Sequence, residues 1–255
     1  MKIISKWIII NYVMAKRREA FRRAVLGVIE MLELQHPYIS VDVHGKASYG
    51  GGQQFSANPM IRRSGCGIIA ATDLLLYLNA RHLHGSVDFF DGLLETEPIP
   101  FPAYTTCISR MNQRYFPMIP YAGINGLMLM DGVRRFLHEQ RMPYSARWCF
   151  SPGNLWSRTE TMLRQDIPVV MSVGPNFPKI WGKRRVRFYI KTGDKSYTPS
   201  AGAKQHYFTV TGMDESWLRI SSWGRLYYIN RRDFEEYIHR HSLSFVSNVL
   251  LVERK

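Results

Sequence analysis

The segment CGIIAATDLLLYL, residues 66–78, constrains the fold more than any other part of the sequence, because nearly all of its residues are apolar or small. Its pattern predicts a helix over residues 66–82. A helix that is apolar all round must be buried on most sides, so it should run through the centre of a domain. The chain has 255 residues, 45% of them hydrophobic, which is enough to build a core around such a helix.

Helical patterns come first along the chain and strand patterns come later. Helices are expected over residues 15–34, 125–140 and 153–166, and the proline-rich stretch 85–123 reads as irregular chain with short helical turns. From residue 167 onward strand patterns predominate, interrupted by one short helix, RRDFEEYIHR. The expected strands are IPVVMSV, RRVRFYI, HYFTVTGM, WLRISSW, RLYYI and FVSNVLLVE. This order predicts an α+β fold in which a helical lobe packs against an antiparallel sheet, with a cleft between them.

The formal net charge of +14 makes an anionic surface or polymer a candidate partner. The basic residues are spread along the sequence without a recognisable nucleic-acid module, so nucleic acid is not an expected partner. The three cysteines form no CxxC pair, and nothing completes a ligand set around His82/His84 or His239/His241, which we interpret as structural. We therefore expect neither a metal nor another cofactor.

The first fourteen residues, MKIISKWIIINYVM, form an apolar stretch that raises the question of a targeting segment. The stretch is interrupted by Lys6 and is too short to span a bilayer. Basic residues follow it, whereas a signal peptide carries its charge in front. We therefore expect no transmembrane segment and a cytoplasmic protein.

The predicted central helix begins at a lone cysteine, Cys66, directly after the flexible pair Ser64–Gly65. A helix N-terminus and a nearby imidazole are the two features that convert a thiol into a reactive thiolate. Among the eight histidines, His206 is the best candidate for that imidazole, because it begins an apolar strand after a loop of small residues. Cys107 and Cys149 show no such context, and we expect both in the core.

Several motifs in this order resemble the papain-like cysteine peptidase superfamily: Cys-Gly opening a helix, then PVVMSV, HYFTVTGMDE and SSWG. Within it, the sequence is similar to bacterial proteins related to the peptidase domains that cleave double-glycine leader peptides. The resemblance implies a papain-like domain over residues 51–255, preceded by an N-terminal helical extension over 1–50. It also implies Cys66 as the nucleophile, His206 as the base, and Ser221 as the residue that orients the imidazole.

Two features depart from the family pattern. Ser221 stands where the family has Asn or Asp, and its hydroxyl carries no charge to stabilise an imidazolium. The glutamine that the family places a few residues before its cysteine, to donate to the oxyanion, is also missing. Gln53, Gln54 and Asn58 are the nearest amides upstream, and we favour Gln54.

The expected function is therefore that of a cysteine peptidase or amide hydrolase, which cleaves a peptide or protein substrate through an acyl-enzyme. One alternative is a catalytically impaired relative that serves as a peptide-binding or scaffold module, and another is a Cys-His acyltransferase. Asp73 falls inside the apolar helix and needs a buried partner, for which we expect an arginine, with tuning of the active site as the lesser alternative. The triple glycine at residues 50–52 is interpreted as a flexible approach to the cleft.

Overall fold

The computed structural model describes residues 31–119, 123–151, 153–174, 183–194, 196–243 and 245–255. Contacts divide the chain into two units, Met1–Met31 and Leu32–Lys255, and the second is described below. The apolar N-terminal segment and most of the helix expected over residues 15–34 lie outside the described residues. Leu32–Glu33, at the end of that expected helix, form a strand, β1, that pairs with the main sheet. Residues 32–50 thus belong to the same unit as the rest of the described chain.

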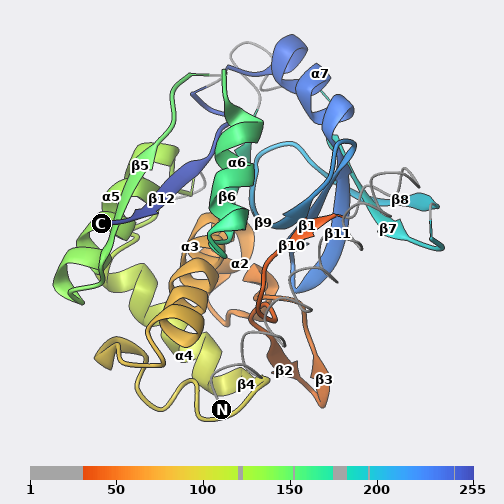
Figure 1. Ribbon diagram of the computed structural model, residues 1–255. Coiled ribbons are helices and arrows are strands. Elements are labelled where there is room, and N and C mark those ends of the chain that lie inside the picture. The colour runs from red at the N-terminus through yellow and green to blue at the C-terminus, as the bar shows by residue number, and fades with distance from the viewer. Residues whose placement is uncertain (1–30, 120–122, 152, 175–182, 195, 244) are drawn as a thin grey trace, which may run out of the picture. The chain divides into compact units, whose positions relative to one another are not determined.

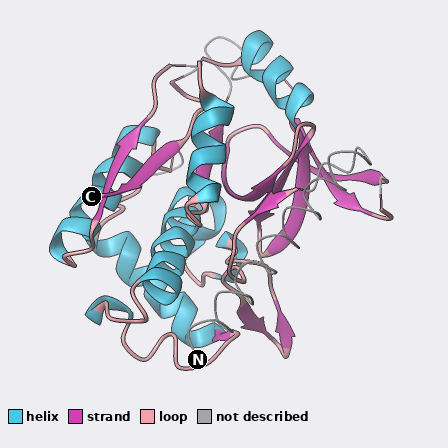
Figure 2. Cartoon of the chain, in the orientation of Figure 1, coloured by secondary structure: helices cyan, strands magenta, loops and turns pink. Residues whose placement is uncertain are grey.

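The second unit has an α+β fold, as the order of patterns predicts (Figure 1). Its helices are α2 (Pro59–Ser64), α3 (Cys66–Tyr77), α4 (Phe101–Arg114), α5 (Gly126–Glu139), α6 (Leu155–Arg164) and α7 (Arg231–His241). Figure 2 shows most of these helices together on one side and the strands of the largest sheet on the other.

The largest sheet is antiparallel and has seven strands, with β1, β9, β10, β11, β7 and β8 following one another and β6 pairing with β9. Its strands are β1, β6 (Val169–Val173), β7 (Val186–Lys191), β8 (Tyr197–Ala203), β9 (His206–Met213), β10 (Trp217–Ser222) and β11 (Arg225–Asn230). Two smaller sheets are formed by β5 (Tyr144–Trp148) with β12 (Leu250–Arg254), and by β2 (Val41–Val43) with β3 (Lys46–Ala47) and β4 (Ile99–Pro100).

Helix α3 is the central element, as its sequence predicts. Every residue from Gly67 to Tyr77 is buried, and the helix contacts β6 and β9 as well as α4 and α5. It continues as a π-helical turn over Leu78–His82, so the observed helical stretch matches the expected 66–82. A helix that is surrounded on all sides removes apolar surface from water around its whole circumference. Polar side chains would lose their hydration there, so the segment contains few of them.

Two expectations about secondary structure were wrong. The stretch 85–123 contains a regular helix, α4, whose proline, Pro102, sits in the first turn, where the missing backbone N–H has no partner to lose. The small residues before His206 form the edge strand β8 rather than a loop, because pairing with β7 outweighs their weak strand preference. Among the described residues, no helix is both long and apolar enough to cross a membrane.

Candidate active site

Cys66 is the first residue of α3 and lies where two helices meet. Helix α2 ends at Ser64, and Gly65 serves as both the C-cap of α2 and the N-cap of α3. The backbone N–H of Gly65 donates to the carbonyl of Ile61 (2.7 Å). This tight junction places the thiol beside the unpaired N–H groups of the first turn of α3, which favour negative charge.

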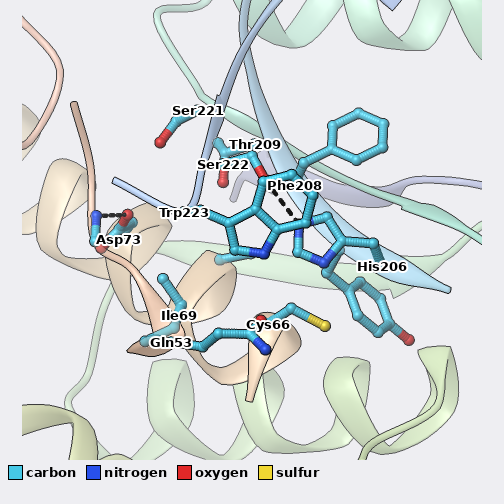
Figure 3. Close-up of a pocket in the computed structure, with 13 residues that line it drawn as sticks. Gln53, Cys66, Ile69, Asp73, His206, Phe208, Thr209, Ser221, Ser222 and Trp223 are labelled. Atoms are coloured by element: carbon cyan, nitrogen blue, oxygen red, sulfur yellow. Dashed lines mark hydrogen bonds between the residues drawn. The ribbon is translucent and has the colours of Figure 1, made fainter. Parts of the chain in front are cut away.

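His206 begins β9 and is held from two sides. Its Nε2 lies 2.7 Å from the hydroxyl of Ser222, and its ring stacks on the indole of Trp223 with the centroids 4.4 Å apart. His206 is 7% exposed. Figure 3 shows the second ring nitrogen on the side of the imidazole that faces Cys66. The ring is therefore held in one orientation by the serine and the indole.

Cys66 and His206 line two connected spaces, together with Gln53 and Trp223. The inner one is a cavity of about 10 Å³, which also reaches Asp73 (Figure 3). The outer one is a cleft of about 620 Å³, within the size range of ligand sites. Apolar side chains along the cleft are Ile124, Leu127, Trp148, Phe150, Phe245 and Val246. The thiol thus borders both spaces, and each is lined by a mixture of polar and apolar groups.

The structure places Ser222, not Ser221, against the imidazole. The Ser221 hydroxyl instead donates to the carbonyl of Tyr49 (2.7 Å), and Ser221 lines the inner cavity together with Asp73. The cause is a register shift between β9 and β10, after which Ser221 pairs with Thr209. In a regular ladder Ser221 would pair with Val210, whose side chain is on the same face of β9 as that of His206. Because of the one-residue shift, Ser222 takes the position beside the imidazole that Ser221 would otherwise occupy.

Of the three candidate amides, Gln53 lies at the site. It is half-buried in a short 3₁₀ turn, Gln53–Phe55, and its Nε2 donates to the carbonyls of Arg62 (2.9 Å) and Arg63 (3.2 Å) at the end of α2. Gln54, which the sequence analysis favoured, instead donates to the carbonyl of Trp223 (2.8 Å). Asn58 caps α2 by accepting from Met60 N–H.

Burial shifts both reactive groups toward their neutral forms. It raises the pKa of the Cys66 thiol, although backbone N–H groups of Tyr207, Gly67 and Cys66 itself act in the opposite direction. Burial lowers the pKa of His206 to about 3. At neutral pH the proton therefore stays on sulfur, and the resting pair is thiol and imidazole rather than thiolate and imidazolium.

No arginine in the described part of the chain pairs with Asp73, contrary to expectation. Its carboxylate accepts from the N–H of Gly51 and from the hydroxyl of Tyr104, both at 2.7 Å. Burial raises the pKa of Asp73 to about 6, although these two hydrogen bonds oppose the rise. The three glycines expected to form a flexible approach to the cleft are buried, and Gly50 and Gly51 lie against this carboxylate.

Cys107, Cys149 and His82 have structural surroundings. Cys107 and Cys149 are buried and free, as expected. His82 lies against the Tyr144 hydroxyl (2.6 Å) and the Asp166 carboxylate (3.3 Å). Within the described ranges, no group of three or more His, Cys, Asp or Glu side chains is placed to hold a metal ion.

Cys66 and His206, which the sequence pairs, line the same cleft, and the residues beside them are Gln53 and Ser222 in place of the expected Gln54 and Ser221. One signal for Ser222 was present, because a glycine inside a strand pattern often marks a bulge, and Gly212 adjoins the observed register shift. No family model, curated protein or solved structure matches the chain.

Proposed function

We propose that this protein is a cysteine hydrolase of papain-like type, which cleaves peptide or related amide bonds through an acyl-enzyme. One observation carries the proposal: Cys66, at the start of a buried helix, and His206, at the start of a sheet strand, line the same cleft. A central helix that carries the cysteine and an antiparallel sheet that carries the histidine is also the arrangement expected of the papain-like family that the motifs resemble.

The neutral resting pair favours general-base catalysis over attack by a preformed thiolate. As Sγ of Cys66 attacks the substrate carbonyl carbon, Nδ1 of His206 takes the thiol proton. The imidazolium that forms is stabilised by the hydroxyl oxygen of Ser222, which accepts from Nε2–H, and by the face of Trp223. The ring then returns the proton to the leaving amine, and water releases the acyl group from sulfur.

The oxyanion of the tetrahedral intermediate can draw on donors at the start of α3. The backbone N–H of Cys66 is a first-turn donor without a helical acceptor. Nε2 of Gln53 is the second donor, and reaches the oxyanion by exchanging its longer bond, the one to the Arg63 carbonyl (3.2 Å). Removing one such donor lowers kcat by about 10²–10³-fold in well-studied hydrolases.

The outer cleft suits an extended chain with apolar side chains. Exposed aromatic and aliphatic groups line it at Leu127, Phe150 and Phe245, and no Asp or Glu occurs among its described lining residues. Such walls offer apolar contact and little attraction for cations. The three free cysteines fit a reducing compartment such as the cytoplasm, which we propose as the location.

The test uses turnover of an internally quenched peptide library together with trapping of the acyl-enzyme by a peptidyl nitrophenyl ester. Wild type should release product and gain a hydroxylamine-sensitive adduct on the peptide that contains Cys66, detected by mass spectrometry. The Cys66→Ala variant should lose both, with turnover lower by at least about 10³-fold. The Cys107→Ala variant, which alters a buried thiol in α4, is the matched control and should stay within about threefold of wild type. Turnover that survives in Cys66→Ala refutes the proposal.

A second candidate function is a peptide-binding module on the same fold. The uncharged Ser222 at the position of the imidazole partner and the engaged amide of Gln53 favour it. This alternative gives saturable binding of library peptides that survives Cys66→Ser, without turnover or adduct. An acyltransferase would instead form the adduct and release it faster when an amine acceptor is added.

A further inference from the structure

The buried carboxylate of Asp73 holds a main-chain segment that reaches both sides of the proposed active site. We call residues 48–54 the glycine segment. Asp73 accepts from the N–H of Gly51 at 2.7 Å, a bond drawn in Figure 3, and Tyr104 donates to the other carboxylate oxygen at 2.7 Å. Asp73 is 2% exposed, so neither bond has to compete with bulk water.

The glycine segment is bonded in turn to the β10–β11 turn, Trp223–Gly224. Gly224 N–H donates to the carbonyl of Gly51 (2.8 Å), and the carbonyl of Gly224 accepts from Tyr49 N–H (2.9 Å). The carbonyl of Trp223 accepts from Nε2 of Gln54 (2.8 Å). Trp223 has φ of 51°, a left-handed conformation that is costly for a bulky residue unless its surroundings impose it. These three bonds supply that constraint.

Gly50 and Gly51 pack so closely against their neighbours that a side chain would not fit at either position. A Cβ atom at Gly51 would lie 1.6 Å from the Tyr104 hydroxyl oxygen. One at Gly50 would lie 2.2 Å from Oγ of Ser221 and 2.8 Å from Oδ2 of Asp73. The backbone therefore packs directly against the carboxylate and its neighbours, so a movement of Asp73 has to move the segment as well.

We infer that Asp73 is a positioning residue for the proposed hydrolase: through Gly51 it fixes the turn that stacks Trp223 on His206, and through the same segment it places the amide of Gln53. This inference rests on the proposed function, because positioning is defined by the reaction it serves. Asp73 contacts neither the thiol nor the imidazole by hydrogen bond, so its effect passes through the main chain.

Loosening this anchor has two distinct consequences. Trp223 no longer covers the imidazole firmly, so water reaches His206 and its pKa rises toward the value of a solvated histidine. The amide of Gln53 loses its fixed place, which weakens a contact made to the oxyanion and not to the bound substrate, so kcat falls while KM stays constant. A purely structural role in the core would produce neither change.

The experiment compares Asp73→Asn and Tyr104→Phe with a control, Tyr77→Phe. Tyr77, one turn after Asp73 on α3, also donates to a buried carboxylate, that of Asp166 (2.6 Å), and its hydrogen bonds to Asp166 and to the His36 carbonyl lie outside the glycine segment. Each variant is first shown to be folded by circular dichroism. The pKa of His206 is then followed by NMR titration of the imidazole C–H resonances, and kcat and KM are measured with the quenched peptides.

In both site variants we expect the pKa of His206 to rise by about one unit or more, and kcat to fall about 10- to 100-fold with KM within about twofold. Tyr77→Phe should leave all three values at their wild-type levels. If Asp73→Asn does not fold, Tyr104→Phe still decides the matter, because it removes one donor and keeps the Gly51 contact.

Site variants that match Tyr77→Phe in the pKa of His206 overturn the inference. If the wild type turns over no peptide, the proposed function has failed, while the NMR comparison still shows whether Asp73 fixes the environment of His206. The two failures are therefore distinguishable.

Discussion

Two buried carboxylates lie at helix α3, Asp73 within it and Asp166 beside its last residue, Tyr77, and the two behave differently. Asp73 and Asp166 are 2% and 4% exposed, and each accepts a hydrogen bond from a tyrosine hydroxyl, at 2.7 and 2.6 Å. Asp73 has one further donor, the N–H of Gly51. Asp166 also accepts from Gln35 N–H (2.7 Å) and lies against His36 Nδ1 (2.5 Å) and His82 Nε2 (3.3 Å).

This difference in donors gives the two carboxyl groups opposite pKa shifts. Burial raises the pKa of Asp73 to about 6, because two neutral donors offset only part of the lost hydration. Burial acts on Asp166 in the same direction, but hydrogen bonds from Tyr77, His36, Gln35 and His82 outweigh it and lower the pKa. The number of donors, rather than depth, decides in which direction the pKa of a buried carboxyl group shifts.

The largest expected effect is at Asp166, which has more hydrogen-bond donors than Asp73. Replacing Asp166 by Asn removes a carboxylate from several donors and should lower the free energy of unfolding at pH 7 by about 3–4 kcal/mol. Urea unfolding measures the change. Asp131→Asn, which breaks an exposed pair with Arg135, is the control and should cost less than about 0.5 kcal/mol. Equal losses in the two variants would show that the Asp166 cluster adds no net stability.

The next largest effect is the pH dependence of the free energy of unfolding, which differs between Asp73 and Asp166 because their pKa values shift in opposite directions. The folded pKa of Asp73, about 6, lies above its ordinary value of 3.8, so the folded state binds the extra proton. The stability it contributes is complete below pH 3.8 and is lost as the pH rises through 6. Relative to Asp73→Asn, wild type should therefore lose about 2–3 kcal/mol between pH 4 and pH 7.

This comparison isolates Asp73 because the titratable groups around it stay neutral in that range. They are Tyr38, Tyr104 and Cys107, and burial raises the pKa of each. His206 gives the opposite slope, since its folded pKa lies below its ordinary value. The rise in this pKa expected in Asp73→Asn makes that slope smaller in the variant, and the NMR titration of His206 in both proteins corrects for it. A difference between wild type and variant that stays flat from pH 4 to 7 would mean that Asp73 is already ionised.

A smaller change in the free energy of unfolding tests the close packing of Gly51 against Tyr104. Gly51→Ala places a methyl group against the Tyr104 hydroxyl and should lower the free energy of unfolding by about 2 kcal/mol. Gly193→Ala is the matched control, since its nearest neighbours would lie 3.7 Å from the new Cβ, and it should change stability by less than about 0.5 kcal/mol. Chemical unfolding at pH 7 measures both. Equal effects would show that the glycine segment has room to adjust.

Much of the secondary structure could be predicted from local sequence patterns. An all-apolar run predicts a buried helix wherever it lies, so α3 was placed correctly, and strand β9 coincides with HYFTVTGM. Helix α4 was missed because prolines were taken as helix breakers, whereas a proline in the first turn is compatible with a helix. Strand β8 was missed because its stability comes from its neighbour β7 and not from its own residues.

The site was predictable only where one residue determines it. Cys66 and His206 each begin an element, and element starts can be read locally. The partner of the imidazole depends on the register between two strands, and a single bulge replaced Ser221 by Ser222. The partner of Asp73 and the choice of Gln53 over Gln54 depend on how a loop folds back over 22 and 9 residues, respectively, and no short-range pattern records that.

The tryptophan in the left-handed turn has a consequence for how this protein can change over generations. Asn or Gly at residue 223 would relax the backbone and suit the hairpin better, so selection for robustness alone would remove the indole. That same replacement would expose the imidazole that the ring covers at 4.4 Å. Thermal stability and shielding of His206 therefore favour different residues at position 223, and tryptophan is the residue that provides shielding.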